Sequence, residues 1–306
     1  MTRHPSGLMQ MTAEVERALI RSEPVVALES SVIAQGLPPE IAPVAAREAQ
    51  QRVRDRGAVP ATIAIIDGVV RVGLDDASID RLANDDDVRK VGGRDLATCA
   101  VSGRCGATTV AGTLAVCAMA GIHFMATGGI GGVHRGWEQT LDISADLTEI
   151  GRTEVCVVCS GAKSLLDIPA TLEMLETRGV PIIGYRTDTL PLFYVTQSRH
   201  ALADRADDAE TIAAAAAAHW GFARRTGLLV VQPVAADVAL AADETEALVE
   251  TALAQASAEG VRGPAVTPWV LARLHAATGG RSLVANQRLL VDNAGLAAEI
   301  AAAYYA

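Results

Sequence analysis

The stretch from Cys105 to Val133 most constrains how this chain folds, because it carries no charged side chain if His123 is neutral. An apolar run of that length could span a lipid bilayer. Glycines and threonines interrupt it, however, and divide it into a helix, a strand and a loop. That division is typical of a buried layer in an α/β fold, so we predict such a layer here and no membrane span.

The composition favours a layered α/β fold. Hydrophobic residues make up 50% of the 306-residue chain but aromatic residues only 3%, so Ala, Val, Leu and Ile must fill the core. Small-residue helices packed on Val- and Ile-rich strands meet that requirement. No repeat or Pro/Ser-rich linker marks a boundary. We predict a single domain over residues 1–306, with residues 1–20 as a loosely ordered or helical N-terminal extension.

The charge balance and the cysteines limit the partners and the compartment. Lys and Arg number 26 against 36 Asp and Glu, a net charge of −10, which repels nucleic-acid phosphates and anionic membranes. Residues 1–11 hold no apolar core of signal-peptide length. Five cysteines, an odd number, favour reduced thiols over a disulfide framework. We therefore expect a cytoplasmic protein that binds small molecules and neither nucleic acid nor membrane.

Strand-like and helix-like patterns alternate along the chain. Apolar runs predict strands at 25–28, 61–66, 69–72, 123–126, 155–159, 180–185 and 228–231. The dipeptide Asp67-Gly68 predicts a type I′ hairpin turn, so part of the sheet is antiparallel. Helical spacing predicts helices at 44–53, 108–120, 209–219, 244–259, 268–277 and 287–305, and one between 167 and 179. We expect the helical tail from Pro233 onward to pack across the sheet edge or to supply an oligomer contact.

Cys156 and Cys159 form a CxxC pair inside the strand-like run 155–159. A strand sends residues at this spacing to opposite faces, which does not suit a redox or metal pair. We interpret both as core thiols, since Cys is a commonly buried residue type and the chain holds no second pair.

The glycine-rich stretch Thr127–Gly136 follows a predicted strand. Its glycines allow backbone N–H groups to approach a phosphate or sugar closely. His134 stands where GxGxxG would have its last glycine, and the GK[ST] of a P-loop is absent, so neither nucleotide motif applies. A sharp structural turn is the alternative, but the adjacent His134-Arg135 favours a ligand-binding loop.

Downstream, Asp142 and Asp146 are four residues apart with Ser144 between them. Carboxylates and a hydroxyl at this spacing suit a hard divalent cation or sugar hydroxyls. Asp and Ser are equally ordinary at the start of a surface helix, and spacing alone favours that second interpretation.

Lys163 follows an apolar strand in a chain whose only other lysine is Lys90. A desolvated lysine can act as an amine nucleophile and form a Schiff base, or it can simply snorkel or bind phosphate. Residue type does not decide between these roles. Glu29, at the end of the first predicted strand, is a candidate general acid. Asn286 is either the N-cap of the final helix or an amide that reads a pyrimidine edge.

Seven motifs closely resemble the pseudouridine-5′-phosphate glycosidase family, in the same order from about Pro24 to the C-terminal helix. They are Val26–Ser30, Gly57–Ile65, Gly106–Ala111, Ala126–Gly136, Asp142–Asp146, Gly161–Ser164 and Gly184–Asp188. The resemblance implies a three-layer α/β/α sandwich around a mixed, largely parallel sheet, assembled as a homotrimer. It also implies reversible cleavage of the C–C bond between uracil and ribose 5-phosphate in pseudouridine 5′-phosphate, helped by manganese (Mn²⁺).

The resemblance also implies roles for individual residues. Lys163 would be the amine that forms the Schiff base, Glu29 the proton donor and Asp142 the metal ligand. Other residues would contact the substrate. Lys90 would contact the sugar or help to open its ring, Val110, Ser144, Ala145 and Asp146 would surround the ribose phosphate, and Thr127, His134 and Asn286 would hold the uracil or the phosphate.

Two segments depart from the family pattern. The family usually has Lys-Val-Ser-Arg-Arg-Asp-Leu where this chain has Gly92 and Gly93 within Lys90–Leu96. It has His-Gly-Met-Pro where this chain has Gln35–Pro38. A class I aldolase-like lyase acting on another phosphosugar, and a phosphosugar-binding accessory protein without turnover, are the alternative hypotheses.

Overall fold

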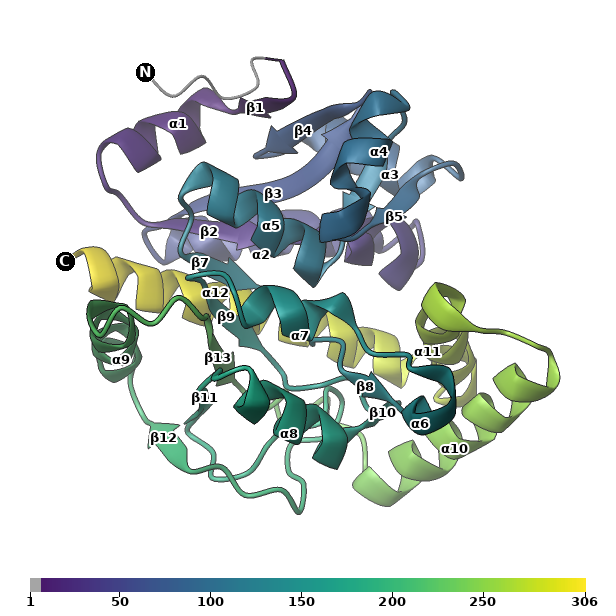
Figure 1. Cartoon of the computed structure of the whole chain (residues 1–306). Helices are drawn as coiled ribbons and strands as arrows, with labels where there is room; N and C mark the ends of the chain where they lie inside the picture. The colour runs from purple at the N-terminus through teal and green to yellow at the C-terminus, as the bar shows by residue number, and fades with distance from the viewer. Residues whose placement is uncertain (1–6) are drawn as a thin grey trace.

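The computed structural model describes residues 7–306, and eleven of their strands form one mixed, mostly parallel sheet (Figure 1). The strand order is β1-β4-β3-β2-β7-β9-β13-β11-β12, with β6 also paired to β3 and β5 paired to β6. Only the β3–β4 and β3–β6 pairs are antiparallel among these strands. The bounds are β1 Met9–Met11, β2 Val25–Leu28, β3 Val59–Ile66, β4 Val69–Val72, β5 Arg89–Val91, β6 Gly106–Thr108, β7 Phe124–Ala126, β9 Cys156–Cys159, β11 Ile182–Tyr185, β12 Asp204–Ala206 and β13 Leu228–Val231.

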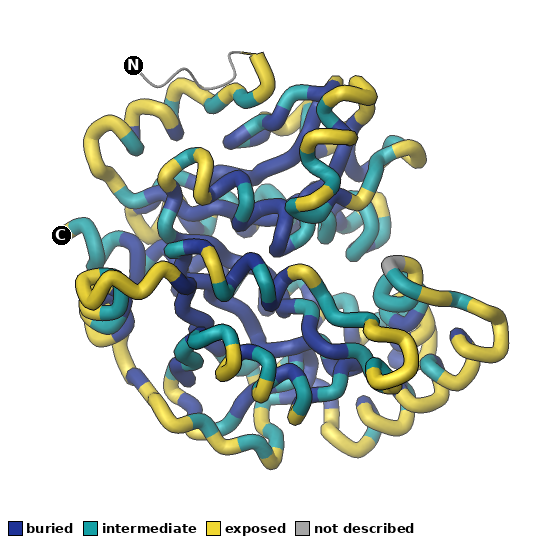
Figure 2. The backbone as a smooth tube through the Cα atoms, viewed as in Figure 1, coloured by how far each residue is buried: buried dark blue, intermediate teal, exposed yellow. Residues whose placement is uncertain are grey.

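Helices cover both faces of the sheet, so the predicted α/β sandwich is confirmed (Figure 1). On one face α2, α9 and α12 pack on the central strands, and α5, α7 and α8 lie on the other. The central strands are the most deeply buried part (Figure 2). The helix bounds are α1 Ala13–Ile20, α2 Ala42–Asp55, α3 Asp76–Asn84, α4 Leu96–Val101, α5 Val110–Ala120, α6 Trp137–Thr140, α7 Ala145–Ile150, α8 Ile168–Thr177, α9 Ala209–Gly221, α10 Ala242–Ala258, α11 Val266–Ala277 and α12 Arg281–Tyr305.

The uncharged stretch forms the buried layer that its glycines predict. It contributes β6, α5 and β7 in succession, and Thr109 caps α5 by accepting a hydrogen bond from the Gly112 N–H. Gly121 ends the helix in the left-handed conformation with φ of 73°. Among residues 7–306, no helix has the length and apolarity needed to cross a membrane.

The hairpin and the CxxC predictions are both confirmed. Asp67 and Gly68 have φ of 50° and 76°, the positive values of a type I′ turn between β3 and β4. Cys156 and Cys159 are fully buried in the separate apolar clusters on the two sides of β9. Burial raises the pKa of each thiol to about 12, so both remain protonated core groups at neutral pH.

The structure adds detail at the two ends of the chain. Of the two forms predicted for the N-terminal extension, residues 13–20 have the helical one, as α1, which buries Val15 and Ala18, while β1 extends the sheet by pairing with β4. Residues 1–6 lie outside the described part. The C-terminal helix α12 covers the sheet face rather than its edge, where it packs on α2, α9 and the central strands. It also begins at Arg281, so Asn286 lies inside the helix, and its interpretation as an N-cap is wrong.

Candidate active site

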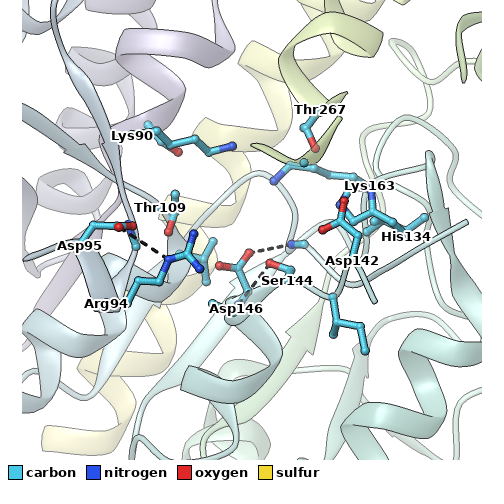
Figure 3. A pocket seen from close by; sticks show the side chains of 18 of the residues that line it. Lys90, Arg94, Asp95, Thr109, His134, Asp142, Ser144, Asp146, Lys163 and Thr267 are labelled. Atoms are coloured by element: carbon cyan, nitrogen blue, oxygen red, sulfur yellow. Dashed lines mark hydrogen bonds and ion pairs between the residues drawn. The ribbon is translucent and has the colours of Figure 1, made fainter. Parts of the chain in front are cut away.

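A cavity of about 390 Å³ opens near the carboxyl ends of β2 and β9, where ligands of parallel α/β sheets collect (Figure 3). Most of the predicted site residues line it, from elements far apart in the sequence. These residues are Glu29, Lys90, Val110, His134, Asp142, Ser144, Ala145, Asp146 and Lys163. A smaller pocket adjoins it, shares Glu29, Lys90 and Lys163, and adds Asn286. The structure therefore gathers the predicted set around one connected space, apart from Thr127.

Glu29 is held by two hydroxyl groups. It lies one residue beyond β2 with 9% of its surface exposed. The Ser31 Oγ donates a hydrogen bond to its Oε2 at 2.5 Å, and the Thr127 Oγ1 donates to its Oε1. Thr127 is buried behind Glu29 and does not line the main cavity. The observed contact of Thr127 is thus with the carboxyl group, and its contact with uracil or phosphate stays a prediction.

Lys163 enters the cavity from the loop that follows β9. The loop needs glycine at position 161 for two reasons. Gly161 has a φ of 83°, which favours glycine, and a side chain there would overlap the Pro191 carbonyl. The Lys163 N–H then donates to the Ile130 carbonyl at 3.2 Å. This bond ties the lysine loop to the glycine-rich loop beside it.

Lys90 reaches the same space from β5, on the opposite wall (Figure 3). It keeps some contact with solvent. Partial desolvation in the concave site lowers its pKa, the charge of Lys163 lowers it further, and Asp146 and Glu29 oppose both effects. The charge of Lys163 therefore disfavours the protonated form of Lys90.

Asp146 links the first turn of α5 to the glycine-rich loop, and both segments line the cavity. Its carboxylate is 6% exposed and accepts hydrogen bonds from the Ala111 N–H at 2.9 Å and the Gly131 N–H at 2.8 Å. Ser144 caps α7 by accepting from the Asp146 N–H at 3.2 Å. The helix-start interpretation of this segment is therefore correct, and the same residues also line the cavity.

His134 and Asp142 meet through the backbone, where the His134 N–H donates to the Asp142 carbonyl at 3.0 Å. His134 belongs to β8 (Val133–His134), which pairs with β10 (Leu166–Asp167), and both short strands were absent from the prediction. Burial lowers the pKa of His134, and Lys163 and Lys90 add to this, while Asp142 opposes it. The imidazole is thus neutral at physiological pH and can accept or donate a hydrogen bond.

The carboxylate of Asp142 fits a hydrated divalent cation better than a protein-enclosed one. Among residues 7–306, no group of three His, Cys, Asp or Glu side chains is arranged to hold a metal ion. Small hard cations commonly bind one or two carboxylates and complete their coordination with water and substrate oxygens. The donor set therefore suits a metal held mainly through water.

The chain is similar to known proteins over nearly its whole length. The family model described as indigoidine synthase A like protein matches residues 14–303. This chain belongs to that family. Pseudouridine-5′-phosphate glycosidases of Gemmatimonas aurantiaca and Escherichia coli are 51% and 48% identical to it, over 95% and 97% of this chain and 95% and 96% of theirs. The predicted resemblance is confirmed, and the protein is an enzyme.

Two solved structures share the fold of this chain. The prealnumycin C-glycosynthase AlnA, in complex with ribulose 5-phosphate, superposes with a TM-score of 0.90 at 42% identity over 98% of both chains. An indigoidine synthase A-like protein from Thermotoga maritima gives 0.91 at 33% identity over 100% of this chain and 99% of its own.

Arg94 lines the cavity in the segment that departs from the family pattern, and our sequence analysis did not select it. Its side chain is 84% exposed and pairs with Asp95 at 3.6 Å, and it extends toward the cavity (Figure 3). A side chain at Gly93 would meet the Glu149 Oε1 at 2.5 Å. Glu149 is buried and paired with Arg152, so a side chain at position 93 would require the Glu149 carboxylate to shift. The sequence signal for Arg94 was its place in the segment Lys90–Leu96, where the family pattern also carries basic residues after the lysine.

Proposed function

We propose that this enzyme reversibly cleaves the C–C glycosidic bond of pseudouridine 5′-phosphate, with water, to uracil and ribose 5-phosphate. Relatives with that name are 43–51% identical to this chain. The observation that carries the proposal is the convergence of one amine, Lys163, and one hydroxyl-held carboxyl, Glu29, on the same cavity.

The chemistry explains why an amine is needed. A carbanion at C5 of uracil is a poor leaving group, so two carboxylates around an oxocarbenium ion are insufficient. In the proposed path the Lys163 amine bonds to C1′ as the C1′–O4′ bond breaks and the ribose ring opens, and a proton lost by the amine ends on O4′ as a hydroxyl group. The nitrogen lone pair then forms a C1′=N bond as the C1′–C5 bond breaks, so the nitrogen donates the electrons that expel the uracil ring. In the reverse, synthetic direction the protonated imine is the electron acceptor.

Glu29 completes that step. The electron pair of the broken bond passes to C5 of uracil, which takes a proton from the Glu29 carboxyl group. Water then hydrolyses the imine, which releases ribose 5-phosphate and restores the amine. Ser31 and Thr127 hold the carboxyl group in place through both reactions.

The remaining residues bind and orient the substrate in this proposal. Lys90 contacts the sugar, and Val110 with Ser144 to Asp146 surrounds the ribose phosphate. Arg94 adds a guanidinium that suits a phosphate group, and His134 and Asn286 contact the uracil or the phosphate. A manganese ion at Asp142 would supply positive charge near the substrate oxygens.

Synthesis from uracil and ribose 5-phosphate, with and without added manganese, tests the proposal. We expect pseudouridine 5′-phosphate as the product, detected by mass and by its resistance to acid hydrolysis, with chelation of the metal lowering the rate. Absence of a uracil-dependent product from folded protein would contradict the proposal. An aldolase-like lyase would act on a phosphosugar without uracil, and an accessory protein would bind one without turnover.

A further inference from the structure

Asn293 is a fully buried amide in the middle of α12, outside the lining of the active-site cavity. Its Nδ2 donates a hydrogen bond to the Thr127 carbonyl at 2.9 Å and lies 3.1 Å from the Ser160 Oγ. The Gly128 carbonyl is a weaker third acceptor at 3.5 Å. Acceptors on two different loops therefore converge on one amide group.

The first loop begins at Thr127 and contacts Glu29, the proposed proton donor. Thr127 uses its carbonyl for Asn293 and its hydroxyl for Glu29. A shift of the Thr127 backbone would therefore move the group that holds the carboxyl oxygen of Glu29. Asn293 reaches Glu29 through this single intermediate residue.

The second loop begins at Ser160, after β9, and carries the Lys163 amine. Ser160 precedes Lys163 by three residues, and its N–H donates to the Gly128 carbonyl at 2.8 Å. Further along, the Ile130 N–H donates to the Gly161 carbonyl at 3.1 Å, before Lys163 bonds back to Ile130. The two loops are thus joined side by side, and Asn293 binds both where they leave the sheet.

An apolar side chain at position 293 would leave the Thr127 carbonyl without this donor. Buried carbonyl groups are rarely left unpaired, because the loss of a partner is costly. The loop would have to move to find another donor. The adjacent Leu289 and Leu290 side chains restrict that movement, since even a Cβ at Gly128 would lie 2.9 Å from Leu289.

We infer that Asn293 is a positioning residue that fixes the distance between the Lys163 amine and the Glu29 carboxyl group. The inference rests on the proposed function, in which bond cleavage needs both groups while imine formation with free ribose 5-phosphate needs the amine alone. Asn293 therefore matters most for the step in which both groups act on one substrate.

The variants Asn293→Ala, Asn293→Asp and Ser160→Ala test this assignment, with Thr245→Val as a control. Thr245 is an equally buried polar residue of a helix, and it bonds the Ala241 carbonyl outside the cavity. Two rates are compared in each variant: borohydride trapping of ribose 5-phosphate on Lys163, and synthesis of pseudouridine 5′-phosphate with its kcat and KM.

We expect trapping to change by less than about threefold in the Asn293 variants while kcat for synthesis falls by about 10²-fold, the scale of a misplaced catalytic group. Asn293→Asp should lose as much as Asn293→Ala, because a carboxylate would face the Thr127 carbonyl. Adding Thr127→Val to Asn293→Ala should lower kcat little further, since both act on Glu29.

Parallel losses of trapping and synthesis, or an unchanged kcat, would overturn the inference. If Asn293→Ala fails to fold, Asn293→Asp and the milder Ser160→Ala carry the same comparison. Wild-type protein that makes no pseudouridine 5′-phosphate would count against the proposed function instead, so the two failures are distinguishable.

Discussion

At the scale of single residues, the cavity is defined by two lysines that face each other across it. They are the only lysines of the chain, and the charge of Lys163 contributes to the lowered pKa of Lys90. Carboxyl groups at Glu29 and Asp146 balance part of this charge. In the proposed function, such a site binds an anionic sugar phosphate while the lowered pKa of Lys90 favours the neutral form of that amine.

The pKa of Lys90 gives a pH-dependent prediction. A neighbouring cation disfavours protonation, so Lys163→Met should raise the pKa of Lys90 toward its ordinary value of 10.5, whereas Lys163→Arg keeps the charge and should leave it lowered. The wild-type protein should therefore have more neutral Lys90 than Lys163→Met at any pH below that value. NMR of ¹³C-methylated lysines resolves the titration, and equal values in the two variants would refute the coupling.

A substitution at Gly131 tests whether the glycine-rich loop must stay in place beside Asp146. A Cβ at this position would overlap the Ser144 Oγ and lie 2.9 Å from the Asp146 Oδ2. We expect Gly131→Ala to lower kcat/KM for synthesis by at least about tenfold, or about 1.4 kcal/mol of transition-state stabilisation. The control is Gly221→Ala, where a Cβ would meet nothing within 4 Å. Equal activity of both variants would show that the loop tolerates displacement.

At the scale of helices and strands, the sequence could predict the part of the site that depends on strand ends. Glu29 follows β2 and Lys163 follows β9, with β7 between them. Because parallel strands place their carboxyl ends at one edge, a correct assignment of these strands already places the two residues near each other. The roles of the residues came from the family motifs rather than from spacing.

Other parts of the site depend on contacts between distant segments, and local patterns do not reveal these. The pairing of β1 with β4 joins segments about 60 residues apart. The Thr127–Glu29 bond and the amide of Asn293 become visible only when the sheet and α12 are assembled. Asn286 suggested a helix start because Asn favours N-caps, although α12 begins earlier.

The position of the cysteines on β9 predicts unreactive thiols. Cys156 and Cys159 are fully buried, as are Cys99 and Cys117, and Cys105 is 5% exposed. Because the thiolate is the reactive form and burial disfavours it, the native protein should not react with a thiol reagent such as DTNB. Unfolding in guanidinium chloride should release five reactive thiols. Rapid reaction of one or two thiols in the native protein would contradict this packing.

At the scale of the whole molecule, the resemblance predicts a homotrimer. The mass of one chain is 31.8 kDa, and light scattering coupled to gel filtration should give three times that value for the purified protein. A monomer or a dimer at the concentrations used for activity would contradict the predicted assembly.

The proposed reaction depends on a Schiff base between Lys163 and the sugar phosphate. Incubation with ribose 5-phosphate and borohydride, followed by peptide mass spectrometry, tests it directly, because reduction fixes an imine permanently. We predict a reduced pentose phosphate adduct on the peptide that contains Lys163, present in Lys90→Ala and absent in Lys163→Ala. Absence of the adduct from active wild-type enzyme, or labelling that survives Lys163→Ala, would contradict the claim.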